Sequence, residues 1–124
     1  MANQEQLQRL QQSVVQTWNR WRLAEPALSL DLDNADMSAL NLGGFNLSHA
    51  HLRAANLTET DGNNVNLSHA ILIDADLSGA NFANADLSYA DFSGANLSNT
   101  YLSGANLREA IITSHQLKQA RSRR

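Results

Sequence analysis

A leucine or phenylalanine recurs at every fifth position through most of this chain, most regularly over residues 74–107. Alanine usually stands two positions before each of these residues, with aspartate or asparagine (Asx) between them. The register extends from Leu32 to Leu117, and of its eighteen positions only Gly62 lacks a large apolar side chain. Its most regular stretch contains Leu77, Phe82, Leu87, Phe92 and Leu97. We predict that these side chains form the core.

A five-residue period excludes both a straight helix and a straight strand. Residues in a helix step by about 100°, so residues five apart would be spread around the axis. In a strand, an odd period would place alternate leucines on opposite faces. The pattern is satisfied if the chain turns a corner every five residues, with leucine and alanine inward and Asx outward. Glycine and asparagine, which tolerate positive φ, recur at the second corner position.

The repeated A-(D/N)-L-x-x register resembles the pentapeptide-repeat family over about 90 of the 124 residues. The resemblance implies an all-β solenoid, a right-handed quadrilateral β-helix with four pentapeptides per coil. Residues 27–119 would then form about four and a half coils. The segment TWNRWRLAEPALSLDL also resembles the leaders of cyanobacterial members.

Residues 1–26 are predicted to form an amphipathic helix that caps the solenoid. Apolar residues recur there at helical spacing, Asn3 can serve as the N-cap, and Pro26 ends the pattern. A solenoid exposes its core and unpaired backbone at each end, so a cap is required. The apolar stripe predicted to cover the first coil consists of Leu7, Leu10, Val14, Trp18 and Trp21.

The C-terminal end offers no comparable apolar stripe, and residues 120–124 are expected to be a basic, disordered tail. This end is therefore either poorly capped or covered by a second molecule. A monomer is favoured over a dimer, and an end-to-end dimer through the C-terminal end is the alternative.

Gly62 interrupts the core register, and a missing leucine would leave a cavity. Two interpretations remain open. Phe82, one coil later in the same column, can supply the missing volume, or the segment around Gly62 forms a bulged corner.

The charge is distributed unevenly. Residues 27–117 carry ten acidic residues against two arginines, a net charge of −8, while the last seven residues carry +4. An acidic body argues against direct nucleic-acid binding. Some members of the resembled family imitate duplex DNA and bind type II topoisomerases. Here aspartates are dispersed over four faces and alternate with asparagines, so topoisomerase modulation is retained only as an alternative function.

The sequence contains no sign of catalysis. It has no cysteine, no distinctive serine–histidine spacing, and no phosphate-binding or dinucleotide motif, so we expect neither enzyme activity nor a cofactor. No apolar run approaches the length of a membrane helix, and the first residues lack signal-peptide features. The expected location is the cytoplasm, without membrane attachment.

Residues twenty apart should stack in one column, which brings His49, His69, Tyr89 and Glu109 to one corner, with His51 close by. Two adjacent histidines could bind a metal ion weakly. The alternative is that an exposed corner simply accepts these residue types.

Outward isoleucines are unusual in this repeat. Ile71 and Ile73 flank Leu72, Ile111 shares the column of Ile71, and Arg53 lies one coil before Ile73. A small apolar patch on one face is typical of a partner site, although scattered surface hydrophobes are also common. The function predicted from the sequence is a non-catalytic, rigid scaffold for protein–protein interaction through these residues.

Overall fold

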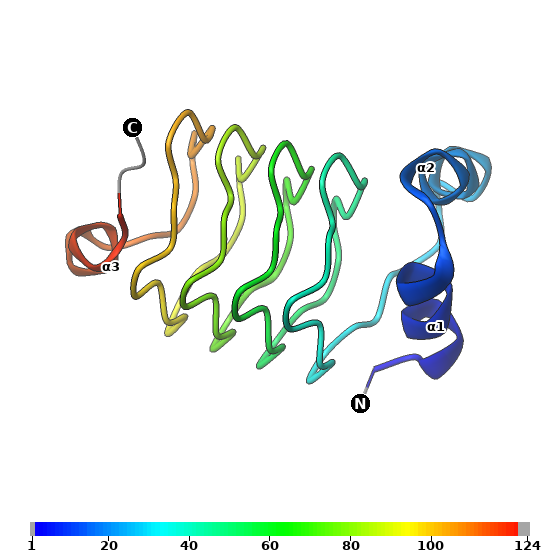
Figure 1. The fold of residues 1–124 in the computed structure, drawn as a ribbon, viewed down its shortest axis with the longest axis horizontal. Helices are drawn as coiled ribbons and strands as arrows, with labels where there is room; N and C mark the ends of the chain where they lie inside the picture. Colours follow the sequence, from blue (N-terminus) through cyan, green and yellow to red (C-terminus); the bar gives the residue numbers. More distant parts are fainter. Residues whose placement is uncertain (1, 122–124) are drawn as a thin grey trace.

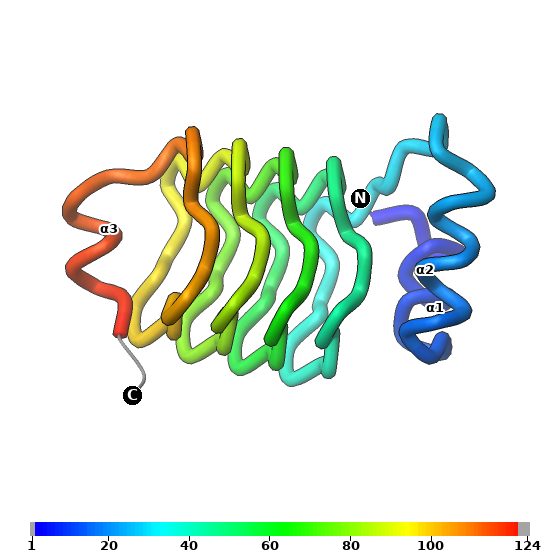
Figure 2. Tube along the Cα trace, turned by 90° about the horizontal axis from the view of Figure 1, so that it is seen from above, coloured from blue at the N-terminus to red at the C-terminus, as the bar shows by residue number. Residues whose placement is uncertain are grey.

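The computed structural model describes residues 2–121, which form a stack of coils with helices at both ends (Figure 1). Two helices, α1 (Gln4–Gln12) and α2 (Val15–Ala24), lie at the N-terminal end. A third, α3 (Ser114–Gln119), lies at the C-terminal end. Figure 2 shows the coils side by side along the long axis between these helices.

Each coil contains twenty residues. Parallel backbone bridges join residues twenty apart, as between His51 and Ile71 and between Ile71 and Asp91. Successive bridging residues along the chain are five apart, so a coil has four sides, each contributing one bridging residue. Residues 31–50, 51–70, 71–90 and 91–110 make four complete coils.

Tight turns form the corners between these sides. The N–H of Ala75, for example, donates to the carbonyl of Leu72 at 3.1 Å, and Asp74 between them has φ of 61°. Positive φ at this turn position explains why glycine and asparagine recur there. The backbone geometry inferred from the five-residue period is therefore present in each complete coil.

The core is the column of inward side chains that the period predicts. Each of Leu77, Phe82, Leu87, Phe92 and Leu97 has no solvent exposure. Complete burial of such side chains contributes about 1.5–3 kcal/mol each. The register ends earlier than predicted, because Leu117 lies in α3 and is 44% exposed.

Phe82 fills the space that Gly62 leaves. A Cβ atom added to Gly62 would lie 2.5 Å from both Cδ1 and Cε1 of the Phe82 ring. The neighbouring Asp61 keeps its bridges to Asn41 and Asn81. Of the two interpretations left open by the sequence, the structure therefore favours a filled gap over a bulged corner.

The N-terminal cap consists of two helices rather than one. Ser13 and Val14 have extended backbones, and the N–H of Ser13 closes α1 on the carbonyl of Arg9. The break places Val14 outside the packed surface at 63% exposure, so its assignment to the apolar stripe is wrong. Leu10 and Trp18 are buried in the core, and Leu7 and Trp21 pack partly against it.

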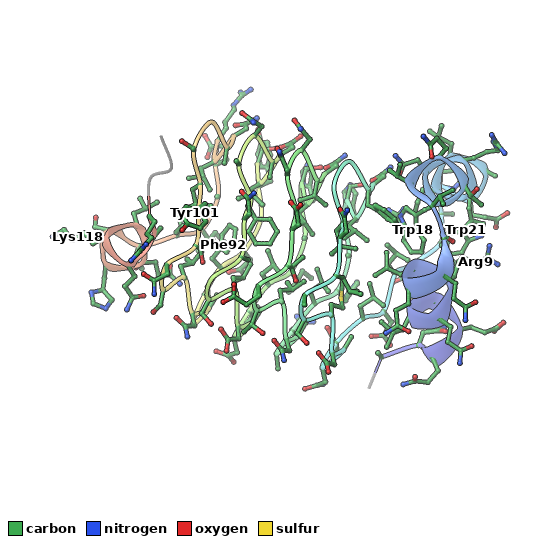
Figure 3. All side chains as sticks on the ribbon, in the orientation of Figure 1. Arg9, Trp18, Trp21, Phe92, Tyr101 and Lys118 are labelled. Carbon is green, nitrogen blue, oxygen red and sulfur yellow. The ribbon has the colours of Figure 1, made fainter. Side chains whose placement is uncertain are left out.

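Hydrogen bonds attach this cap to the first coil. The Trp18 Nε1–H donates to the carbonyl of Asn46 at 2.7 Å, and Gln6 Oε1 accepts from the N–H of Asp31 at 2.8 Å. Figure 3 shows Trp18 and Trp21 on α2 at this end of the stack. The first coil has no preceding coil with which to pair its backbone, and these contacts satisfy some of the groups left open at that edge.

The C-terminal end is also capped by the chain itself. Thr113 and Gln116 form a capping box that starts α3, and the buried Gln116 side chain donates to the carbonyls of Phe92 at 2.7 Å and Ala95 at 3.1 Å. After the helix, Arg121 forms a bridge with Tyr101. The expectation of a disordered tail is therefore wrong for residues 120–121, and 122–124 lie outside the described residues.

We expect Gln116→Ala to loosen the last coil. The change removes a donor from two buried carbonyls. The carbonyl of Phe92 keeps its bond from the Ala95 N–H at 2.9 Å, but that of Ala95 loses the donor that Gln116 supplies, and an unsatisfied buried group costs about 1–3 kcal/mol. Hydrogen exchange of residues 91–112 should accelerate. Lys118→Ala, an exposed change on the same helix, is the matched control and should leave that exchange unchanged. Equal exchange in both variants would contradict this role for Gln116.

Candidate surface for partner binding

Most outward Asx side chains support the corners of the coils. Asp76 Oδ1 accepts hydrogen bonds from the Ser78 N–H at 3.0 Å and from the Ser78 hydroxyl at 2.8 Å. Asn66 makes the same two contacts with Ser68 at 3.0 and 2.7 Å. Aspartate and asparagine can both make these contacts, because only one side-chain oxygen accepts the two hydrogen bonds. The corresponding hydroxyl and N–H of Ser38 lower the pKa of Asp36.

This use of aspartate bears on the alternative of DNA mimicry. The aspartates at the bridging positions lie on several faces and are interspersed with neutral asparagines in the same structural role. No specific feature of their arrangement favours binding to a topoisomerase.

One face of the solenoid departs from the Asx pattern more than the others. We call it the isoleucine face, and its bridging residues are Asp31, His51, Ile71, Asp91 and Ile111. Three of these five are not Asx. Two other faces carry Asx at every bridging position, namely Asp36, Asn56, Asp76 and Asn96 on one and Asn46, Asn66, Asp86 and Asn106 on the other. The fourth face carries Asn41, Asp61 and Asn81 and then Tyr101 and Arg121, so its departures lie at the C-terminal end. Within the central coils, the outward residues that are not Asx are therefore concentrated on the isoleucine face.

The structure brings several of the predicted partner residues together on this face. Ile71 is paired between His51 and Asp91, and Ile73 follows it at the adjoining corner position; both isoleucines are half-buried. Arg53 is exposed, and its backbone N–H donates to Asp33 Oδ1 at 2.8 Å. Ile111 is 57% exposed, but Asp91 separates it from Ile71. The apolar patch is thus centred on Ile71 and Ile73.

A stack of three rings lies along the corner next to this face. The His49 and His69 ring centroids are 4.7 Å apart with planes within 5°, and the His69 and Tyr89 centroids are 4.8 Å apart with planes within 1°. All three residues have positive φ near 60°, so their side chains leave equivalent backbones in parallel. We call these three residues the histidine corner.

Stacking is a poor arrangement for chelation. Zinc requires imidazole nitrogens about 2.0–2.1 Å from one ion, with lone pairs that converge on it. The His49 and His69 rings are parallel, with centroids 4.7 Å apart, so their in-plane lone pairs run in parallel planes and do not converge on one point. Among residues 2–121 there is also no group of three or more His, Cys, Asp or Glu side chains placed to hold a metal ion.

The sequence did not reveal the contact that Arg22 makes with the solenoid. It reaches from α2 and donates from Nη2 to the carbonyl of Ser48 at 2.6 Å, next to His49, while its buried Nε has no hydrogen-bond partner. Burial lowers the pKa of Arg22. Burial also lowers the pKa of His49, and the nearby charges of His69 and Arg22 lower it further. The only sequence signal was an arginine on a predicted capping helix.

No helix within residues 2–121 combines the length and hydrophobicity that crossing a membrane requires.

Twenty-residue coils with inward alanine and leucine and outward Asx define a pentapeptide solenoid. A sequence profile described as "Pentapeptide repeats (8 copies)" matches residues 31–61, 63–99 and 85–121. The chain therefore belongs to the pentapeptide-repeat family, as its sequence register predicts. No curated protein matches the sequence.

Solved structures of similar proteins include cyanobacterial members. The pentapeptide repeat protein Rfr23 from the cyanobacterium Cyanothece 51142 is 37% identical, with a TM-score of 0.67, over 77% of this chain and 61% of that one. A thylakoid-lumen protein of Arabidopsis thaliana is 29% identical, with a TM-score of 0.63, over 74% and 61% respectively. A protein from Nostoc PCC 7120 is 30% identical, with a TM-score of 0.52, over 74% and 79%.

This chain thus spans about three fifths of the length of the first two relatives. One of them comes from the thylakoid lumen, so the expectation of a cytoplasmic protein stays a prediction.

Proposed function

We propose that this protein is a non-catalytic scaffold, wound as a right-handed quadrilateral β-helix, that binds a protein partner through the isoleucine face. The observation that carries the proposal is the concentration of non-Asx bridging residues on that face. Ile71 and Ile73 form its apolar centre, with Arg53 and Ile111 at its margins.

The substitution of Asx by isoleucine has a local cost. At Ile71 no side-chain oxygen can accept the N–H of residue 73, whereas Asp91 accepts the N–H of Ser93 at 2.9 Å one coil later. Such a hydrogen bond contributes about 0.5–1.5 kcal/mol. An outward residue that gives up this contact and leaves apolar surface in water is more easily explained by binding than by folding.

The corner serines support a non-catalytic role. Their hydroxyls donate to Asx oxygens within the same turn, as Ser88 does to Asp86 at 2.6 Å and Ser93 does to Asp91 at 2.6 Å. A nucleophilic serine instead needs a neighbouring base such as histidine. These hydroxyls are used to hold the turn, and the solenoid offers a rigid surface that loses little conformational entropy on binding.

The test is affinity capture from the native cell with the intact protein and a double variant, Ile71→Glu with Ile73→Glu. Two carboxylates in the apolar centre should reduce recovery of the bound protein at least tenfold, because charge burial in an interface is unfavourable. Circular dichroism should show that the variant keeps its fold.

Asn63→Glu with Ala83→Glu is the matched control. It adds two charges at corner positions equivalent to that of Ile73, on the side opposite the isoleucine face. Capture should survive in this control. If Ile71→Glu with Ile73→Glu binds as well as the unmodified protein, the isoleucine face is not the site.

A further inference from the structure

The attachment of α2 to the solenoid ends directly beside the histidine corner. Asn19 Nδ2 donates to the carbonyl of Gly44 at 3.0 Å, and Asn19 Oδ1 accepts from the Asn46 N–H at 2.7 Å. Arg22 then donates to the carbonyl of Ser48. These contacts cover residues 44–48, immediately before His49, so the position of α2 depends on the backbone that carries the first ring of the stack.

We propose that the histidine corner makes the N-terminal cap pH-sensitive: protonation of His49 and His69 separates the stacked rings and weakens the attachment of α2 through Arg22. This regulatory role is independent of the partner surface proposed above. Mild acidification would loosen the cap and leave the remaining coils folded.

The charges around His49 favour this behaviour. Arg22 faces it from α2 and His69 faces it from the next coil, and both disfavour the protonated ring. Tyr89 follows His69 in the stack, so Glu109, the acidic residue of this column, is separated from His49 by two rings. Protonation of both histidines would therefore place three positive groups in succession.

The other charged groups near His49 lie on α2 and on the first two coils. Along the chain His49 is followed by His51 and Arg53 at the start of the second coil, and their column neighbours in the first coil are Asp31 and Asp33. On α2, Arg20 is exposed, and the exposed Glu25 is the C-cap. Neither Glu25 nor the two aspartates contributes to the shift in the pKa of His49, which burial, His69 and Arg22 account for.

The direction of the effect follows from proton linkage. The pKa of His49 is lower in the folded protein than in the unfolded chain, so the unfolded chain binds more protons as the pH falls below about 6.5. The stability that neutral His49 contributes is present above that pH and is lost as the pH falls toward its folded pKa. The lowered pKa of Asp36 acts in a separate window, below its ordinary value of 3.8.

Tryptophan fluorescence can report on the cap alone, because both tryptophans, Trp18 and Trp21, lie on α2. We would measure urea unfolding of the intact protein at pH 7.5 and 5.5 by fluorescence and by far-ultraviolet circular dichroism. At pH 5.5 the fluorescence transition should precede the circular dichroism transition, and the apparent constant for cap opening should rise at least fivefold.

The decisive variants remove one imidazole each. His49→Asn and His69→Asn place a residue that already occupies this corner type at Asn34 and Asn64, and both should abolish most of the pH shift. His51→Asn is the matched control, because it restores Asx at a bridging position outside the stack, and it should retain the shift. The proposal is overturned if the unmodified protein shows no pH shift, or if His51→Asn removes the shift as fully as the corner variants.

Discussion

Gly62→Leu should destabilise the solenoid by about 1–3 kcal/mol or more, although leucine is the usual residue at this position of the repeat. Even a methyl group there would lie 2.5 Å from two atoms of the Phe82 ring and 3.2 Å from Val65 Cγ1. Phe82 has no solvent exposure, so its ring cannot make room by turning into water without leaving the core. Urea unfolding followed by circular dichroism measures the loss.

The compensating variant makes this prediction specific. Phe82→Leu alone should also destabilise the protein, because it leaves unfilled space over Gly62. Gly62→Leu combined with Phe82→Leu restores the usual residue in both coils and should recover most of the lost stability. If the double variant loses as much as the two single variants together, Phe82 does not occupy the space that Gly62 leaves.

The repeating core was readable from the sequence because the backbone assigns each position of the pentapeptide a fixed direction. Leu77 and Leu87 must point inward if the chain turns every five residues, and Asp76 must then point outward. The interpretation of Gly62 was left open because period alone gives no volumes. The choice required the distance between its backbone and the Phe82 ring.

The two ends were less predictable because their structure depends on contacts between distant residues. A helical period cannot show that Ser13 and Val14 adopt extended backbones. It also cannot show that Trp18 donates to the carbonyl of Asn46, which is distant in the sequence. Gln116 is likewise one glutamine among many until the fold places its side chain within hydrogen-bonding distance of the carbonyls of Phe92 and Ala95. The structure of each cap depends on the end of the solenoid that it covers, and the residues of that end come together only in the folded chain.

The candidate surface could be predicted from the sequence only in part. The column map brought Ile71 and Ile111 to one face, but it could not show that Ile73 is half-buried or that Arg22 reaches Ser48. It placed His49, His69 and Tyr89 in a column, and only the structure showed parallel rings. Stacking changes the chemistry expected there from metal binding to mutual charge repulsion.

Trp18→Ala should remove most of the N-terminal cap's stabilising effect. Truncation of a fully buried tryptophan costs about 3–5 kcal/mol, and the carbonyl of Asn46 also loses its donor. Coils in a solenoid contact only their neighbours, so the damage should be local. Hydrogen exchange should accelerate strongly over residues 30–50 and change little over residues 91–110.

Leu23→Ala on the same helix is the control, because Leu23 is 78% exposed and its truncation should leave exchange unchanged. Uniform acceleration through every coil in Trp18→Ala would contradict local unfolding and indicate a single cooperative unit. Unchanged exchange over residues 30–50 would instead show that α1 alone protects the first coil. The expected gradient follows from the architecture, since an uncapped end exposes one coil at a time to water.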